Sequence, residues 1–321
     1  MSNNQINDVV PTSLSHIACE SNHGVIEQVR VAIDAAFEDS RRFDDTLITG
    51  PPGVGKSSLS FVVSQEMAVG FHEVLGQNLK TTADLNNLLL SCESKSICLI
   101  DEIHEAPRHI QTALLMCLDK QQIMVRGGSS IQAIPVADFT LIAATTEPYQ
   151  VLEPLRQRAK LHLELSFYTE NDLAVLVDRR ARSLGWEVDT AILPMIATRG
   201  KGTPRLALRL LQAARRVTRA GGEYRTTVDH LLKACRLEHL DTLGLGPLEQ
   251  RYLHLLVDGP RRVNVLASSL GVPTKTLSSV TEPFLIRAGL IEKDDQSRRV
   301  LTAKGCQHLV DSVSESSPKS C

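Results

Sequence analysis

The chain has 321 residues, of which 42% are hydrophobic, and its formal net charge at pH 7 is −2. A chain of this length can bury a sizeable core, and we expect two or three domains. The near-neutral charge excludes a general attraction to polyanions, so any contact with nucleic acid must come from local basic patches.

The seven cysteines are scattered, with no CxxC pair and no histidine partner at zinc-like spacing. This pattern indicates reduced thiols in a cytosolic protein. The first residues do not resemble a secretory segment, and no apolar run approaches the ~20 residues that cross a bilayer. We therefore expect a soluble, cytoplasmic protein without a membrane partner.

The first half of the chain alternates short apolar runs with helix-like stretches. Such alternation is typical of a parallel sheet with helices on both faces, an α/β fold. Aliphatic and β-branched residues run on without polar alternation in the segments expected to be buried strands. These segments are residues 46–49, 74–75, 96–100 and 139–144.

From residue 168 to about 237 the apolar residues recur at helical spacing, which predicts a small helical domain. The segment from about residue 244 predicts three helices, near 248–256, 263–270 and 277–290, followed by a short strand at 300–301. This pattern is typical of a winged helix. We therefore divide the chain into a large α/β domain at 1–167, whose first ten or so residues we expect to be disordered, a helical domain at 168–240, a winged helix at 241–310 and a polar tail at 311–321.

A glycine-rich segment, residues 50–57, matches the phosphate-loop pattern GxxxxGK[ST] between a predicted strand and a predicted helix. Its glycines allow backbone N–H groups to turn toward phosphates, and the helix N-terminus adds partial positive charge. Lys56 is expected to reach the β and γ oxygens, and Ser57 to bind Mg²⁺. The residues expected to bind ATP here are Gly50, Pro51, Gly53, Val54, Gly55, Lys56, Ser57 and Ser58.

A second element follows at residues 96–102, where an apolar strand ends in two adjacent carboxylates. Ligands bind at the carboxyl edge of parallel sheets, so these carboxylates are expected beside the phosphates. We predict that Asp101 holds Mg²⁺ and that Glu102 orients and deprotonates the attacking water. Together with the phosphate loop, the pair predicts a Mg²⁺-dependent ATPase.

The sequence Asp101-Glu102-Ile103-His104, with the Gly-Pro-Pro-Gly form of the phosphate loop, resembles the RuvB branch of the AAA+ ATPases. This resemblance implies an AAA+ sheet domain, a helical lid and a winged helix. Residues 139–146 resemble the sensor-1 strand of that family, which implies that Thr146 senses the γ-phosphate. Thr145 takes this role if the register is shifted by one residue.

Residues 154–158 resemble the family segment that ends in the arginine finger, which implies that Arg158 reaches into a neighbouring subunit of an oligomeric ring. A guanidinium supplied in this way stabilises charge on the transferring phosphoryl group. The family continues with Phe-Gly, whereas Ala159-Lys160 follow here. Arg156 and Lys160 therefore remain alternatives for the same role, and each of these cations can also be an ordinary surface charge.

The resemblance also covers the lid. Residues 167–169 resemble the hinge that leaves the sheet, which places Tyr168 beside adenine, although Tyr168 can equally be a core aromatic residue. Residues 200–205 resemble the sensor-2 stretch, in which Arg205 points back at the phosphates from a helix N-terminus. A contact that exists only with phosphate present would convert hydrolysis into domain rotation.

In the winged helix, residues 281–291 resemble the family segment in which a glutamate-proline pair opens the helix before the wing. The residues expected to contact DNA phosphates are Lys293, Arg298 and Arg299. Three acidic neighbours, at 292, 294 and 295, weaken the match because they repel the same backbone. The wing can therefore also be a solvated hairpin or a surface that docks protein.

Two further segments bear on partners and on adenine. Val10 stands where the family has an arginine that closes over adenine. Residues 123–134 predict a hairpin with Gly127-Gly128 at its turn. In RuvB proteins this hairpin docks the junction-binding partner RuvA, so a RuvA-like partner is implied.

The resemblance extends from about residue 29 to 309 in the same order. It implies an ATP-driven DNA translocase, a helicase that drives branch migration of four-way junctions in recombination and repair as a hexameric ring. Two alternatives remain open. One is an AAA+ remodeller whose winged helix binds protein, and the other is a nucleotide-gated DNA-binding regulator with little turnover.

Overall fold

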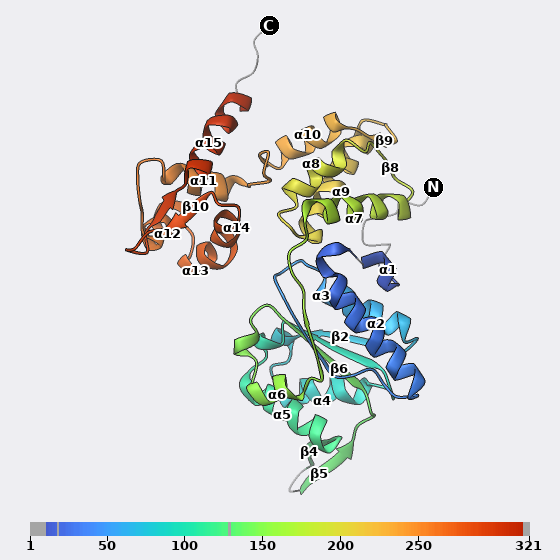
Figure 1. Cartoon of the computed structure of the whole chain (residues 1–321). Coiled ribbons are helices and arrows are strands. Elements are labelled where there is room, and N and C mark those ends of the chain that lie inside the picture. Colours follow the sequence, from blue (N-terminus) through green and yellow to red (C-terminus); the bar gives the residue numbers. More distant parts are fainter. Residues whose placement is uncertain (1–10, 18, 128–129, 317–321) are drawn as a thin grey trace. The chain divides into compact units, whose positions relative to one another are not determined.

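The computed structural model describes residues 11–17, 19–127 and 130–316, and Val10 and Gly128 lie outside them. The chain forms two compact units (Figure 1). The first contains Met1–Gly185 with Gly202–Arg205, and the second contains Trp186–Lys201 with Leu206–Cys321. The first division falls after Gly185 rather than at residue 167, so the three-domain division stays a prediction.

A five-stranded parallel sheet in the order β2-β3-β6-β1-β7 forms the centre of the first unit. The four strands expected from the sequence are confirmed to within a few residues. The edge strand β7 was not expected, because its exposed and buried residues alternate and no continuous apolar run marks it. The strands are β1 (Thr46–Thr49), β2 (Phe71–Leu75), β3 (Ile97–Asp101), β6 (Thr140–Thr145) and β7 (Leu161–Glu164).

Helices cover both faces of this sheet, as the fold class requires (Figure 1). On one face, Cys98 and Ile100 of β3 pack in a core cluster with Leu89 of α4 and Leu114 of α5. Ile97 and Leu99, also fully buried, face the other side because side chains alternate along a strand, and α3 packs there. The helices and short turns of the unit are α1 (Leu14–Ile17), η1 (Glu20–Asn22), α2 (His23–Glu38), α3 (Lys56–Glu66), η2 (Gly76–Asn78), α4 (Thr82–Ser91), η3 (Ile103–Glu105), α5 (Arg108–Lys120), η4 (Pro148–Gln150), α6 (Glu153–Arg158) and α7 (Glu170–Ser183).

The predicted hairpin at 123–134 is confirmed. Strands β4 (Gln122–Gly127) and β5 (Ser130–Pro135) pair antiparallel, with Ile123 opposite Ile134. Figure 1 shows the hairpin extending away from the sheet beside α5. The predicted turn at Gly127-Gly128 includes residues outside the described part of the chain.

The second unit begins with helices of the lid and continues into the winged helix. The lid elements are β8 (Glu187–Val188), α8 (Ile192–Arg199), α9 (Pro204–Ala220), β9 (Arg225–Thr226) and α10 (Val228–Leu237), and the first two residues of α9 group with the first unit. The remaining elements are α11 (Pro247–Leu255), α12 (Val263–Leu270), α13 (Thr274–Thr276), η5 (Leu277–Thr281), α14 (Glu282–Arg287), β10 (Ile291–Lys293), β11 (Arg299–Leu301) and α15 (Ala303–Ser316).

One expectation for the winged helix needs correction. The helix expected at 277–290 contains a π-turn at Leu277–Thr281, because Pro283 has no N–H to continue the α-helical ladder, and α14 ends at Arg287. The first residues of the expected polar tail, 311–316, continue helix α15. Leu309 of α15 joins the winged-helix core, and a helix anchored in this way extends at little cost into the polar residues beyond it.

Candidate active site

The phosphate loop joins β1 to α3, as the sequence predicts. Gly50 and Gly55 have φ values of 142° and 105°, a backbone conformation that residues with a Cβ rarely adopt. A Cβ added to Gly50 would also lie only 2.3 Å from the carbonyl oxygen of Leu165. Val54 of the loop is buried, and Ser58 lies in the first turn of α3. The loop backbone therefore depends on its glycines for its shape.

Lys56 is the first residue of α3, directly after this loop, and 5% of its surface is exposed. Its Nζ donates to the carbonyl oxygens of Gly50, at 3.0 Å, and Pro51, at 3.2 Å. Burial lowers the pKa of its ammonium group, while the carboxylates of Glu102 and Asp101 oppose that shift. The arrangement keeps a cation beside a ring of backbone groups, which suits a phosphate.

Two side chains with hard oxygen atoms meet beside Lys56. The Ser57 hydroxyl, in the first turn of α3, donates to Oδ2 of Asp101 at the end of β3, at 2.7 Å. Oxygens of this kind are the ligands that Mg²⁺ prefers. The predicted metal ligands therefore converge, although they lie 44 residues apart in the sequence.

Glu102 follows Asp101 with a left-handed backbone, φ 48°. This conformation costs a residue with a Cβ about 1–2 kcal/mol and is typical of functional sites. Its Oε2 accepts hydrogen bonds from Thr146 N and Thr146 Oγ1, both at 2.9 Å. Its Oε1 lies 3.7 Å from Lys56 Nζ. Phosphate loop, carboxylate and predicted sensor-1 residue thus form one cluster at the carboxyl edge of the sheet.

His104 and Thr145 complete this cluster, and the sequence did not assign a role to His104. His104 Nδ1 lies 3.0 Å from Thr145 Oγ1 and 3.3 Å from Glu102 Oε2. The signal was present in the Asp-Glu-Ile-His segment, because a turn after the strand brings its fourth residue back toward the second. Thr146 contacts Glu102 and Thr145 contacts His104, while the sensor role of either threonine stays a prediction.

The lid residues Tyr168 and Arg205 lie in the same compact unit as the phosphate loop. The Arg205 backbone N donates to Gly53 O at 3.3 Å, and a Cβ on Gly53 would lie 3.2 Å from the Arg205 Cβ. Tyr168 is buried, and its hydroxyl accepts a hydrogen bond from Asn22 at 3.1 Å. Its burial is what the core alternative predicts, while its contact with adenine stays a prediction.

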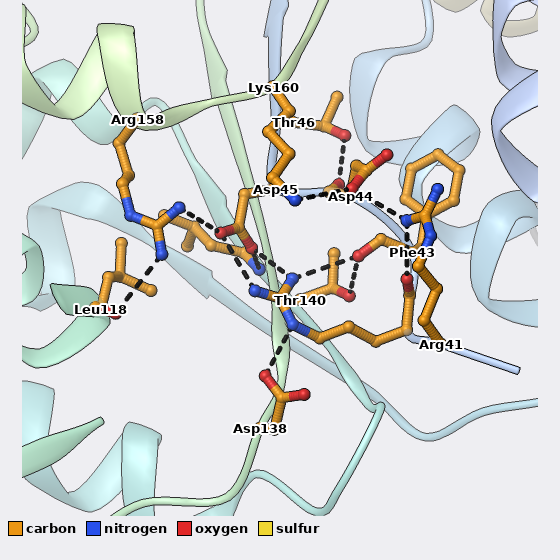
Figure 2. A network of polar contacts seen from close by, with 12 residues as sticks. Arg41, Phe43, Asp44, Asp45, Thr46, Leu118, Asp138, Thr140, Arg158 and Lys160 are labelled. Carbon is orange, nitrogen blue, oxygen red and sulfur yellow. Dashed lines mark hydrogen bonds and ion pairs between the residues drawn. The ribbon is translucent and has the colours of Figure 1, made fainter. Parts of the chain in front are cut away.

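Arg158 lies beside Asp45 and Leu118 (Figure 2). Its Nη1 is 3.4 Å from Oδ2 of Asp45, the residue before β1, and its Nε is 3.4 Å from Oδ1 of Asp119 at the end of α5. The phosphate loop starts at the other end of β1, about 13 Å along a four-residue strand. Arg158 therefore lies near the amino edge of the sheet, opposite the edge that holds Lys56.

The two alternative cations lie differently. Arg156 stacks on Tyr149, with its guanidinium carbon 5.9 Å from the ring centroid, three residues beyond Thr146. Lys160 is largely exposed, and its Nζ lies 3.4 Å from Asp44. Arg156 and Arg158 are two residues apart on α6, so they point to different sides of that helix.

The DNA contact predicted for Arg299 in the wing needs correction. Arg299 was expected to contact DNA, but it is 7% exposed and donates from Nε and Nη2 to both carboxylate oxygens of Glu282, each at 2.9 Å. The same carboxylate accepts from Tyr252 Oη at 2.8 Å. The pairing raises the pKa of Arg299. A guanidinium buried in this way holds β11 to α14 and is not available to a phosphate.

The other two predicted DNA contacts are at the surface of the wing. Arg298 Nε pairs with Asp294 Oδ2 at 2.7 Å, in a turn that Asp294 also closes by accepting from the backbone N of Arg298 and Gln296. Lys293, at the end of β10, is exposed. Only Lys293 among the three is presented to solvent without a carboxylate contact in the described structure.

Within the described residues, no helix combines the length and apolar character needed to span a membrane.

Three protein-family models match consecutive parts of the chain. They are the Holliday junction DNA helicase RuvB P-loop domain at residues 10–165, the RuvB AAA lid domain at 168–241 and the RuvB C-terminal winged helix domain at 242–310.

The chain is also similar to individual proteins over nearly its full length. It is 33% identical to the Holliday junction branch migration complex subunit RuvB of Thermotoga maritima, over 95% of this chain and 93% of that protein. It is 36% identical to the RuvB subunit of Granulibacter bethesdensis, over 88% of this chain and 81% of that protein. The structure of the Thermotoga maritima RuvB Holliday junction branch migration motor superposes with a TM-score of 0.80 at 32% identity, covering 94% and 98% of the two chains.

Proposed function

Because the chain belongs to the RuvB family of P-loop ATPases, we propose that it couples ATP hydrolysis to branch migration of four-way DNA junctions. The observation that carries this proposal is the cluster of Lys56, Ser57, Asp101, Glu102 and Thr146 at one edge of the sheet. We further propose boundaries for its three domains at residues 167 and 240, which the ranges of the family matches support.

The triphosphate would bind over the phosphate loop, with Lys56 on the β and γ oxygens. The ammonium group now contacts two carbonyl oxygens and, at 3.7 Å, Glu102. Phosphate oxygens form stronger charge-assisted hydrogen bonds than neutral carbonyls, so Lys56 would exchange these partners for the nucleotide. Arg205, adjacent to Gly53, would approach the phosphates from the lid helix.

Ser57 and Asp101 are the residues that would hold Mg²⁺, which neutralises phosphate charge when it is bound. Glu102 would orient the attacking water and accept its proton. Thr146, which donates twice to Glu102, would keep that carboxylate aimed at the site.

Arg158 would act in a neighbouring subunit of a ring, which we propose to be a hexamer. Its position near the amino edge of the sheet keeps it away from the phosphate loop of its own chain. Arg156 is the weaker alternative because it stacks on Tyr149, close in sequence to the sensor strand of the same subunit. A guanidinium supplied in this way contributes about 10³–10⁵ in turnover rate in P-loop GTPases.

Contacts outside the ring follow from two surfaces. Lys293 and Arg298 on the wing would bind DNA phosphates, and the β4–β5 hairpin, with Met124 exposed, would dock a RuvA-like junction-binding protein. We place the protein in the cytoplasm, where junction DNA and ATP meet. Arg298 pairs with Asp294 and Arg299 pairs with Glu282, so both cations of the wing already have carboxylate partners. This pairing favours one alternative, an AAA+ remodeller whose winged helix binds protein.

The ATPase rate with and without four-way junction DNA tests the proposal. We expect junction DNA to stimulate turnover, and binding to forked DNA to weaken steeply with salt. Lys56→Ala protein serves as the control for contaminating ATPases. Magnesium-dependent turnover that ignores junction DNA, together with absent salt-sensitive binding, would exclude the DNA motor and leave the protein remodeller.

A further inference from the structure

The side chain of Arg158 contacts its own subunit through all three nitrogens, and Figure 2 shows the contacts with Asp45 and Leu118. Nη1 lies 3.4 Å from Asp45, Nε lies 3.4 Å from Asp119, and Nη2 donates to the Leu118 carbonyl oxygen at 3.4 Å. The side chain is nevertheless 30% exposed. The guanidinium of Arg158 thus contacts its own subunit, while the side chain as a whole stays partly open to solvent.

Asp45 is a rigid partner. It is 3% exposed, and its Oδ1 accepts from Arg42 Nη1 at 2.7 Å and from the backbone N of Leu141 in β6 at 3.0 Å. Its Oδ2 accepts from Arg42 Nη2 at 3.2 Å and faces Arg158. Because strand β6 and Arg42 together fix this carboxylate, its charge has one defined position relative to the sheet.

Asp119 is a different kind of partner. It lies at the carboxyl end of α5, and 56% of its side chain is exposed. No buried group depends on it in the contacts described for the first unit. Removing its charge should therefore change the position of Arg158 without disturbing the core.

Arginine has enough N–H donors to be positioned by its own subunit and still bind a further oxygen. A guanidinium has five N–H donors, and three contacts leave two for an oxygen outside the subunit. All three contacts are long at 3.4 Å, so they orient the group without competing strongly with a phosphate. Two carboxylates behind the guanidinium also reduce the rotamer entropy that is lost when it reaches a neighbouring subunit.

We propose that Asp45 and Asp119 are positioning residues for Arg158, and that they hold its guanidinium in the orientation used for hydrolysis in the adjacent subunit. This inference rests on the proposed role of Arg158 in trans. It assigns a function to two carboxylates that come from different parts of the sheet domain, one before β1 and one at the end of α5.

Steady-state ATPase kinetics of the full-length protein test the inference, with Asp119→Asn as the main variant and Asp45→Asn as the second. We expect each to lower kcat about tenfold, leave KM for ATP unchanged and leave nucleotide binding intact. Asp119→Glu keeps the carboxylate and should restore most of the rate. Asp138→Asn is the matched control, because Asp138 contacts Arg42 at 2.7 Å but not Arg158.

A double-mutant cycle separates positioning from a general structural effect. In an Arg158→Ala background, Asp119→Asn should cause no further loss, because the group it positions is gone. Mixing Asp119→Asn subunits with Glu102→Gln subunits should restore part of the turnover, since the two changes affect opposite faces of each subunit interface.

The outcomes also separate this inference from the proposed function. If Arg158→Ala turns over normally, the trans role of Arg158 is wrong. If Arg158→Ala is slow but Asp119→Asn and Asp45→Asn match Asp138→Asn, the positioning inference alone is wrong. Faster turnover of Asp119→Asn would likewise overturn it, because the carboxylates would then be restraining Arg158 from its task.

Discussion

The phosphate-loop pocket and the wing both place cations beside carboxylates, yet the two regions use them differently. In the pocket, Lys56 contacts two carbonyl oxygens and a carboxylate at 3.7 Å, which are partners that a phosphate can replace. In the wing, Arg299 donates to both oxygens of buried Glu282 at 2.9 Å. Whether a cation can bind phosphate therefore depends on which carboxylate the fold puts against it.

The contrast explains why charged residues in the sequence predicted their contacts better in the pocket than in the wing. The carboxylates of the pocket stand at the carboxyl end of a parallel strand, the edge at which such sheets bind ligands, and they lie beside the phosphate loop. The carboxylate that neutralises Arg299 comes from α14, 17 residues away, and forms part of the winged-helix core. Substitutions in each region can break or sharpen this comparison.

The largest effect is expected for Glu102→Gln. Loss of the general base should lower ATP turnover by about 10²–10⁴-fold. ATP binding should persist, because Lys56 and the loop backbone remain, and bound ATP should stabilise oligomers. Turnover measured beside binding of a fluorescent ATP analogue checks this expectation, and undiminished turnover would remove Glu102 from its assigned role.

The next effect is structural and lies in the wing. Arg299→Ala leaves Glu282 buried without its partner, so the free energy of unfolding should fall by about 3–5 kcal/mol. The matched control Arg298→Ala removes a half-exposed ion pair and should change it by less than about 1 kcal/mol. Denaturant unfolding followed by circular dichroism measures both, and equal small effects would contradict the structural role of Arg299.

Lys56→Ala probes the exchangeable cation of the pocket. Loss of a charge-assisted contact with the phosphates should weaken ATP binding about 10- to 100-fold or more. Isothermal titration with a non-hydrolysable ATP analogue gives the dissociation constant directly. Unchanged affinity would mean that the cluster at the carboxyl edge of the sheet does not bind the triphosphate.

The smallest effect is expected for Lys293→Ala. Removal of one phosphate contact should reduce the slope of log affinity against log salt by about 1 and weaken junction binding uniformly across sequences. Asp294→Asn should act in the opposite direction, because it releases Arg298 and removes a repelling charge. Fluorescence anisotropy over a salt series measures both, and identical slopes for all proteins would move DNA binding away from the wing.

Much of the sheet and the phosphate site could be predicted because their signals are local. Each element is indicated by a pattern within a few residues: the apolar run at 46–49, the glycines of the loop and the pair Asp101-Glu102. Strand β7 escaped prediction because an edge strand alternates and has no continuous apolar run. The π-turn at Leu277–Thr281 also escaped, although Pro283 marks the place where the helical ladder is interrupted.

The amino-acid sequence by itself predicted which residues would carry phosphate chemistry, because the loop and the strand end require those residue types at short spacing. Only the tertiary structure decided which charges are available. Arg158 meets Asp45 across 113 residues and Arg299 is buried against Glu282, and neither pairing leaves a local pattern. The physical reason is that electrostatic partners are chosen by distance in the folded chain, whereas motifs record only distance along it.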